Sequence, residues 1–191
     1  MKSVKNNERT IIIKNSRFIC FLFHVEKKEE ILKILEEMRE KYYDATHCCF
    51  AYILDNEKKE SDDGEPSGTA GIPMLQVLEK NGLNHVLCIV IRYFGKIKLG
   101  AGGLIRAYTR CVTETLRDHM ITLKKGFCVS ISFSYEKLKL IDHFLKDNLI
   151  IQKEFCETIT YQINISAEDL EKLKGIPDIK IKVLTSLYLP D

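Results

Sequence analysis

The run RFICFLFHV, residues 17–25, constrains the fold more than any other segment, because a continuous apolar and aromatic run of this kind is typical of a buried β-strand. The preceding TIII, residues 10–13, is a candidate partner strand. HCCFAYIL at 47–54 and VLCIVIRYF at 86–94 also have strand-like composition. With 45% hydrophobic residues, the chain has ordinary globular apolar content and can bury a substantial core.

Segments with helical periodicity alternate with these strands. Between residues 26 and 43, four residues recur at the spacing of an amphipathic helix: Ile31, Leu35, Met38 and Tyr42. Pro73 fits only the first turn of a helix, so a second helix is expected to begin near Gly71 and to stop near Gly82. A third is expected to begin near Gly103, with a face formed by Leu104, Ala107, Tyr108, Cys111, Thr115 and Leu116. The polar residues 55–67 predict an exposed loop.

The remainder of the chain repeats strand and helix patterns in the order βαββαβ. KKG, residues 124–126, is the candidate boundary, which predicts domains 1–124 and 125–191. EKLKLIDHFLKD, residues 136–147, and SAEDLEKLKG, residues 166–175, are the expected helices, and Ser166 with Asp169 resembles a capping box. We therefore predict an α+β protein with a C-terminal ferredoxin-like domain.

Composition favours a cytoplasmic protein. The seven cysteines are an odd number without C-x-x-C spacing, lie mostly in apolar segments, and are expected to be reduced. The first residues lack the apolar core of a secretory signal, and no apolar run approaches the roughly 20 residues of a membrane-spanning helix. The net charge of +2 does not by itself indicate a nucleic-acid binder, although the positive excess lies before residue 126.

Two glycine-bearing segments resemble the signature of a known family: SDDGEPSGTAGIPMLQVL, residues 61–78, and RYFGKIKLGAGGLIRAY, residues 92–108. With KNSRFIC and YYDATHCCFAYIL, they make nearly the whole chain similar to the IMPACT/YigZ family. The chain departs from the family pattern at Lys96, where a second glycine is common after RYFG, at Ile72, where arginine is common, and at Ile91, where threonine is common.

The resemblance implies two domains. The first would have the ribosomal-protein-like, elongation-factor-like α/β sandwich fold that is also shared with small-molecule kinases of the GHMP type, and the second would be ferredoxin-like. Such folds do not determine an activity. Eukaryotic relatives regulate translation by competing for the activator of an amino-acid-starvation kinase and carry an additional RWD domain. The resemblance implies a bacterial-type member without that domain.

The KLGAGG segment is a candidate anion site. Its glycines allow a backbone to approach a ligand, and a helix beginning there would point amide donors and the positive end of its dipole outward. Lys96, Lys98 and Arg106 could add charge-assisted contacts to phosphate. The segment lacks the Walker spacing, however, so close helix–strand packing with solvated lysines is the competing interpretation.

Arg106, Arg110 and Arg117 recur at helical spacing and are expected to share a solvent-facing stripe that suits a phosphate backbone. A nearby Glu114 or Asp118 could neutralise this stripe. The neighbouring aromatic residues are expected in the core rather than as stacking surfaces for bases: Tyr93, Phe94 and Tyr108.

The acidic loop offers Asp62, Asp63 and Glu65 beside two hydroxyl residues. Structural ion pairing is the favoured interpretation, cation or phosphate-linked binding comes second, and catalysis is the least supported. HCC at residues 47–49 is a nominal metal cluster, but side chains of strand neighbours alternate between faces, which argues against zinc.

The leading hypothesis is a translation-associated regulatory binding protein that engages RNA, the ribosome or another phosphate-rich partner through the first domain. An enzyme acting on a small phosphorylated ligand and a protein-interaction regulator, with a translation-regulatory protein as partner, are the competing hypotheses. No catalytic residue and no cofactor is predicted, and the sequence leaves a metal and the oligomeric state open. The candidate ligand-binding residues are Asp62, Asp63, Glu65, Ser67, Thr69, Arg92, Lys96, Lys98, Gly100, Gly102, Gly103, Arg106 and Arg110.

Overall fold

The computed structural model describes residues 1–146 and 148–190. Asp147, at the end of a predicted helix, and Asp191, at the end of the predicted second domain, lie outside the described residues. The chain divides into two compact units, Met1–Thr122 and Leu123–Asp191. Both units combine helices with antiparallel strands, which confirms the predicted α+β class.

The first unit is built on a five-stranded antiparallel sheet. Its strands lie in the order β2 (Asn7–Ile13), β3 (Ser16–His24), β6 (Val86–Tyr93), β4 (His47–Leu54) and β5 (Glu57–Ser61). The short β1 (Lys2–Val4) pairs instead with the beginning of β7 (Met120–Phe133). The three apolar runs found in the sequence form β3, β4 and β6, the inner strands of the sheet, as their composition predicts.

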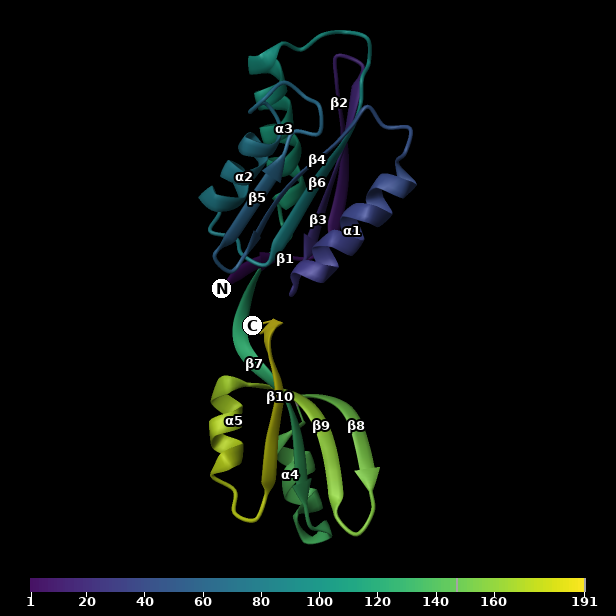
Figure 1. Cartoon of the computed structure of the whole chain (residues 1–191). Coiled ribbons are helices and arrows are strands. Elements are labelled where there is room, and N and C mark those ends of the chain that lie inside the picture. Colours follow the sequence, from purple (N-terminus) through teal and green to yellow (C-terminus); the bar gives the residue numbers. More distant parts are fainter. Residues whose placement is uncertain (147, 191) are drawn as a thin grey trace. The chain divides into compact units, whose positions relative to one another are not determined.

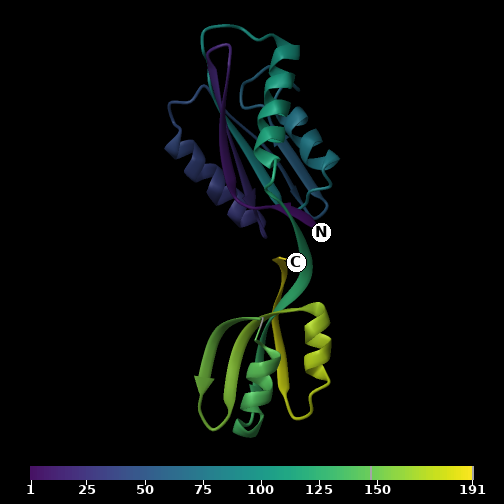
Figure 2. The same ribbon diagram turned by 180° about the vertical axis from the view of Figure 1, so that it is seen from behind.

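Helices cover both faces of this sheet, so the unit has three layers (Figures 1 and 2). α2 (Gly71–Lys80) and α3 (Ala101–Leu116) share one apolar core with the sheet. α1 (Lys28–Lys41) packs on the opposite face in a second core. The six residues predicted to face inward from the third helix are all buried. Gly82 ends α2 in the left-handed conformation, with φ 65°.

β5 corrects the expectation of an exposed loop over residues 55–67. Its sequence, EKKES, has no apolar residue, and this is the reason that the pattern did not indicate a strand. The strand lies at the edge of the sheet and pairs only with β4, so charged side chains are tolerated there. The loop that follows is not fully exposed either, because Glu65 and Thr69 are buried.

The second unit contains α4 (Leu138–Phe144), β8 (Leu149–Phe155), β9 (Ile159–Ser166), α5 (Ala167–Lys174) and β10 (Lys180–Pro190) after the greater part of β7. A short 3₁₀ turn precedes α4. Its strands lie in the order β10-β7-β9-β8, and every neighbouring pair is antiparallel. The KKG segment lies inside β7 rather than in a linker.

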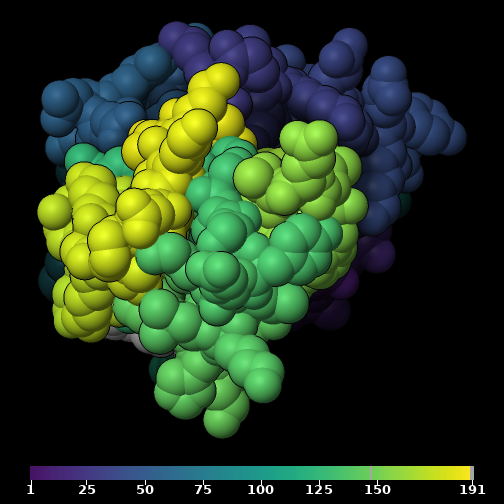
Figure 3. All heavy atoms as spheres, turned by 90° about the horizontal axis from the view of Figure 1, so that it is seen from below, coloured from purple at the N-terminus to yellow at the C-terminus, as the bar shows by residue number. Residues whose placement is uncertain are grey.

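One apolar core holds the second unit together, with residues from α4, α5 and the sheet. Tyr161 and Phe133 meet edge to face in it, with ring centroids 5.2 Å apart. Ser166 caps α5 by accepting a hydrogen bond from the Asp169 amide at 3.0 Å, as the capping-box pattern predicts. Figure 3 shows the surface of this unit in green to yellow.

No helix among residues 1–146 and 148–190 is both long enough and apolar enough to cross a membrane. All seven cysteines are free thiols, as expected. Six of them are buried, as their apolar segments suggest, whereas Cys156 is exposed.

Candidate functional site

A buried ion pair joins the two glycine-bearing segments. Arg92, near the end of β6, is only 4% exposed, and Glu65, in the loop before α2, is 7% exposed. The Arg92 Nη1 atom donates to Glu65 Oε1 at 2.5 Å. Removing two charges from water is costly unless they are paired and hydrogen-bonded. The burial of each charge is therefore stable only while the other residue is present.

Hydrogen bonds also connect Glu65 to α3 and, through Tyr108, to β4. The hydroxyl of Tyr108, on α3, donates to Glu65 Oε1 at 2.8 Å, and Cys49 Sγ on β4 donates to that hydroxyl oxygen at 3.3 Å. Burial and the neighbouring Cys49 and Glu65 raise the pKa of Tyr108 far above its usual value, so the phenol stays protonated and remains a donor. Tyr108 is a core residue, as predicted.

Arg92 makes weaker contacts on its other sides. Its Nη2 atom lies 3.4 Å from the Ser16 hydroxyl oxygen. Its guanidinium carbon lies 5.2 Å from the ring centroid of Phe18 and 5.4 Å from that of Phe94, within the range of cation–π contacts. Its Nε atom is buried and has no hydrogen-bond partner among the described residues. Arg92 therefore has donor capacity that the surrounding side chains do not use.

The ion pair lies at the wall of a cavity of about 380 Å³. Four segments line this cavity: Thr46 and His47, Glu65 and Pro66, Arg92 and Phe94, and residues 98–101 with Leu104. Small-molecule sites in proteins have comparable volumes. We call this space the Arg92 cavity. Of the predicted site residues, it brings together Glu65, Arg92, Lys98 and Gly100.

His47 adds a titratable group to the Arg92 cavity. Its Nδ1 atom lies 2.8 Å from the backbone carbonyl oxygen of Asp63, and a carbonyl only accepts, so Nδ1 carries a proton. Its Nε2 atom lies 3.7 Å from Glu65 Oε2. Sequence reasoning favoured His47 as a hydrogen-bonded histidine in a packed strand over a metal ligand, and nothing in HCC indicates that His47 lies near Glu65.

The two aspartates of the acidic loop bind backbone amides rather than facing a ligand. Asp62 Oδ1 accepts from the amides of Ala70 and Gly71 at 2.9 and 2.8 Å, and Oδ2 accepts from the amide of Gly68 at 2.7 Å. Burial raises the pKa of Asp62, but these hydrogen bonds outweigh it and lower the pKa below its usual value. Asp62 therefore caps the N-terminus of α2, although it is not adjacent to this helix in the sequence.

Asp63 has a similar structural role. Its Oδ2 atom accepts from the Cys48 amide at 2.6 Å, which holds the loop against β4. Thr69 closes a local turn, since its hydroxyl donates to the carbonyl oxygen of Pro66 at 2.6 Å. Ser67 is exposed. The structure does not place these three residues in the Arg92 cavity.

The glycine loop ends at the N-terminus of α3. Gly100 precedes the helix with φ 70° and ψ 165°, a conformation that residues with a Cβ rarely adopt. α3 begins at Ala101, two residues earlier than predicted, and has neither a side-chain cap nor an acidic residue in its first turn. A Cβ on Gly103 would lie 3.1 Å from Leu99 Cβ, so this glycine allows the loop before α3 to pack closely against the helix. Gly102 is exposed.

The two lysines of this loop differ in position. Lys98 lines the Arg92 cavity, is exposed, and forms no ion pair among residues 1–146 and 148–190. Lys96 does not line the cavity and has a left-handed backbone, with φ 65°. The left-handed conformation explains why a glycine is expected at this position in the family pattern.

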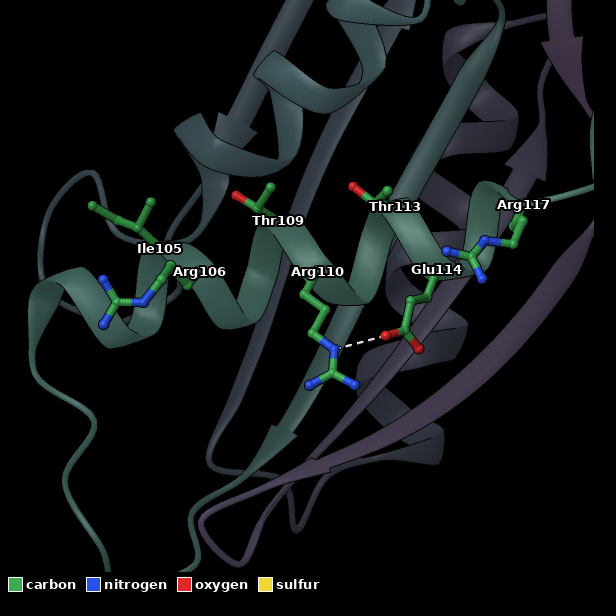
Figure 4. Close-up of a pocket in the computed structure, with 7 residues that line it drawn as sticks. All are labelled: Ile105, Arg106, Thr109, Arg110, Thr113, Glu114 and Arg117. Atoms are coloured by element: carbon green, nitrogen blue, oxygen red, sulfur yellow. Dashed lines mark hydrogen bonds and ion pairs between the residues drawn. The ribbon is translucent and has the colours of Figure 1, made fainter.

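The outer face of α3 carries the predicted arginine stripe (Figure 4). Arg106, Arg110 and Arg117 line one shallow depression of about 340 Å³ together with Thr113 and Glu114. Arg110 is not free, because its Nε atom donates to Glu114 Oε1 at 2.6 Å. Arg106 and Arg117 form no ion pair within the described part of the chain. Of the two acidic residues that were expected to be able to neutralise the stripe, Glu114 pairs with Arg110.

No group of three or more His, Cys, Asp or Glu side chains within the described ranges is arranged to hold a metal ion. Cys48 and Cys49 are both buried in β4. Burial, followed by the charge of Asp63, raises the pKa of Cys48 to about 11. A thiol with this pKa is a poor ligand at neutral pH, since metals bind the thiolate.

Comparisons with known proteins agree with this architecture. The family model described as "Impact N-terminal domain" matches residues 14–116, a range that contains both glycine-bearing segments. IMPACT family member YvyE of Bacillus subtilis is 38% identical, over 94% of this chain and 89% of the relative. IMPACT family member YigZ of Escherichia coli is 43% identical, over 81% of this chain and 80% of the relative.

A solved structure described as a crystal structure of an hypothetical protein has a similar fold. It superimposes with a TM-score of 0.61 and 29% sequence identity, and the match covers 96% of this chain and 97% of that one. The match therefore extends beyond the segment that the family model covers. Taken together, the family model and the two bacterial relatives show that the chain belongs to the IMPACT family.

Proposed function

We propose that this chain is a translation-associated regulatory binding protein whose first unit engages RNA, a ribosomal component or a related phosphate-rich partner. The chain belongs to the IMPACT family. The resemblance implies that eukaryotic relatives in this family regulate translation, and this supports an association of the chain with translation. The observation that carries the proposal is the outer face of α3, where three arginines line one accessible depression. This role places the protein in the cytoplasm.

The arginines of this face are expected to contribute unequally. The hydrogen bond from Arg110 lowers the pKa of Glu114, so Glu114 is charged at neutral pH and offsets much of the charge of Arg110. Arg9 on β2 also donates to the backbone carbonyl oxygen of Glu114, at 2.8 Å. Arg106 and Arg117 form no ion pair in the described ranges, although the charge of Arg117 also lowers the pKa of Glu114. These two arginines supply the main phosphate contacts.

The specific folds of the units belong to the same proposal. The order β10-β7-β9-β8, with one helix in each β-α-β connection, supports a ferredoxin-like second unit. The three-layer arrangement of the first unit supports the ribosomal-protein-like and elongation-factor-like sandwich. Both are folds that occur in components of the translation apparatus according to the family resemblance. They do not by themselves establish the activity.

The test is a salt titration of RNA binding. Fluorescence anisotropy of a labelled single-stranded RNA would be measured between 50 and 200 mM KCl for the full chain and for the double variant Arg106→Ala/Arg117→Ala. Each phosphate contact to a single strand contributes about 0.7 to the slope of log K against log salt concentration. We expect the double variant to bind more weakly and its slope to fall by about 1.4.

Two further variants test whether RNA binding depends on the outer face of α3 or on the total charge of the protein. Lys33→Ala removes a well-exposed cation from α1, on the other face of the sheet, and should leave the slope unchanged. Glu114→Gln should increase RNA affinity, because Arg110 is then no longer neutralised. An unchanged affinity and slope in the double variant would contradict the proposal. Purified ribosomes in place of the RNA test the second class of partner with the same variants.

A further inference from the structure

We propose that the Arg92 cavity binds a small phosphate monoester that carries one flat apolar ring. This site has a different lining from the arginine face of α3, although Arg106 of that face also lies near the first turn of the helix, and the inference does not depend on binding of RNA. It rests on three features: an uncompensated helix N-terminus, a buried arginine with unused donors, and an apolar wall beside both.

The N-terminus of α3 lacks the negative charge that the other long helices receive. α1 has Glu29 and Glu30 in its first turn, and α5 has Glu168 and Asp169. The amides at the start of α2 bind the Asp62 carboxylate. Such groups stabilise a helix because its first amides and its dipole present positive charge. α3 has no acidic residue in its first turn and no side-chain cap.

Cations surround this N-terminus instead. Lys98 lies three residues before the first residue of α3 and lines the Arg92 cavity. The guanidinium of Arg106 lies over the first turn, since its Nη1 atom would be 3.5 Å from a Cβ placed on Gly102. Positive charge beside the positive end of a helix dipole is unfavourable. An anion bound there would relieve this repulsion and would satisfy the free amides.

Arg92 is the independent observation that points to a ligand. It is 4% exposed, lines the cavity, and its Nε atom is buried without a hydrogen-bond partner among the described residues. Buried donors are nearly always satisfied in proteins, so an unpaired one in a cation needs an explanation. A guanidinium has five N–H donors, of which Glu65 and Ser16 take two. Protein atoms enclose Nε, so a ligand oxygen in the cavity would accept from the remaining hydrogens of Nη1 and Nη2.

Charge and donor number favour phosphate over carboxylate. Glu65 compensates Arg92, so the charge available to a ligand comes from Lys98 and the α3 N-terminus, with a contribution from His47 when it is protonated. A phosphate monoester carries roughly −1.5 to −2 charge at neutral pH and three strong acceptor oxygens. A carboxylate has one charge and two oxygens, and would leave more of these donors unsatisfied.

The remaining wall is apolar. Phe94 is 42% exposed although it is a large aromatic residue, and its ring lines the cavity with Pro66 and Leu104. Aromatic rings stack on flat ligands at a modest gain in affinity. The volume of about 380 Å³ holds a phosphate and a single ring system, whereas a polynucleotide needs an extended groove. The geometry therefore selects a small molecule.

The experiment follows the backbone amides of the full chain by ¹⁵N–¹H NMR during titration with phenyl phosphate. We expect saturable shifts at Ala101, Gly102 and Gly103, with inorganic phosphate binding about tenfold more weakly because it lacks the ring. Benzoate, which has the ring without the phosphate, should bind more weakly than phenyl phosphate. Tighter binding of benzoate would overturn the assignment to phosphate.

Variants locate the site. Ala101→Glu places a carboxylate at the helix N-terminus and should abolish saturable binding, while Lys98→Ala should weaken it about tenfold. Phe94→Ala should remove the preference for phenyl phosphate over inorganic phosphate. Arg117→Ala, at the other end of α3, should leave the binding of phenyl phosphate unchanged, which separates this test from that of RNA binding. Circular dichroism and the dispersion of the NMR spectrum check that each variant is folded.

Three further outcomes would overturn the inference. The first is the absence of saturable shifts at the start of α3 with phenyl phosphate. The second is binding by Ala101→Glu as tight as that of the unmodified chain. The third is shifts confined to Arg110 and Arg117, which would assign the anion to the outer face of α3. Loss of RNA binding in the single variant Arg117→Ala would leave each of these outcomes unaffected, because Arg117 lies at the other end of α3.

Discussion

The N-termini of α2 and α3 lie within the two glycine-bearing segments of one unit, yet their backbone amides are treated in opposite ways. At the start of α2 the backbone amides are already hydrogen-bonded inside the protein, because the Asp62 carboxylate accepts from the amides of Gly68, Ala70 and Gly71. We call this N-terminus closed. The start of α3 has no side-chain cap and no acidic residue in its first turn, and Lys98 precedes it. We call this N-terminus open. The difference separates a loop that the protein uses for its own stability from one that is available to a ligand.

Glycine serves different purposes in the two segments. A Cβ on Gly71 would lie 2.2 Å from Glu60 Oε2 and 2.9 Å from the Ser61 amide nitrogen, so this glycine allows α2 to begin against β5. Gly100 has no heavy atom within 4 Å of such a Cβ and is required only by its positive φ. Tight packing thus accompanies the closed N-terminus, and open space accompanies the other.

The largest predicted effect comes from the ion pair that joins these segments. Glu65→Ala should lower the free energy of unfolding by about 3–5 kcal/mol, because Arg92 is left buried without its partner. Urea denaturation measures the change. The double variant Glu65→Leu/Arg92→Met should recover most of the loss, since apolar residues of similar size need no partner. A double variant as unstable as Glu65→Ala would show that the pair is not the cause.

Opening the closed N-terminus should have the next largest effect. Asp62→Ala removes three amide hydrogen bonds and should cost about 2–3 kcal/mol in urea denaturation. Asp63→Ala, which removes one amide hydrogen bond, should cost about 1 kcal/mol. Equal losses in the two variants would contradict the special role of Asp62.

The contribution of Asp62 should also depend on pH. Its pKa in the folded chain is below the unfolded value of about 3.9, so its stabilising effect is complete above that value and is lost as pH falls through the folded pKa. The stability difference between the unmodified chain and Asp62→Asn should therefore be constant near neutral pH and shrink below about pH 4. Thermal unfolding at a series of pH values measures this. A constant difference down to pH 2 would be inconsistent with the lowered pKa.

Closing the open N-terminus should produce a smaller gain in stability. Ala101→Glu should raise the free energy of unfolding by about 0.3–1 kcal/mol in the absence of ligand, because an acid then lies at the positive end of α3. Chemical denaturation at low ionic strength measures the gain, and added salt should reduce it. Ala101→Gln is the control without charge. Destabilisation by Ala101→Glu would contradict the electrostatic description of this helix.

The smallest predicted effect concerns the backbone of the loop before α3. Lys96→Gly should stabilise the chain by about 0.5 kcal/mol, because relief of the left-handed strain exceeds the entropy that glycine adds to the unfolded state. Lys98→Gly is the matched control and should destabilise, since φ of Lys98 is not positive. Differential scanning calorimetry resolves the difference. Equal effects of both changes would refute the role assigned to Lys96.

The sequence predicted the regular elements well wherever apolar residues recur. The strand His47–Leu54 and the start of α2 at Gly71 were located to the residue, because periodicity and the position of Pro73 are local signals. β5 was missed because a polar edge strand has no such periodicity. The pairing of Arg110 with Glu114, four residues apart on a helix, was within reach of the sequence.

The roles of the acidic residues could not be read from the sequence. Asp62, Asp63 and Glu65 lie within four positions of one another, yet one caps α2, one binds β4 and one pairs with Arg92. Their roles depend on the path of an irregular loop, which is determined by contacts with distant segments rather than by a repeating pattern. For the same reason the sequence indicated Phe94 as a core residue, whereas the structure exposes it at the Arg92 cavity.

The polar composition of β5 has a consequence for solubility. A sheet edge offers unpaired backbone groups to the strand of any other chain, and such contacts lead to aggregation. Along EKKES, a second chain pairing with β5 would have to desolvate a row of lysine and glutamate side chains. This margin of the sheet therefore resists strand addition through the charge of its side chains.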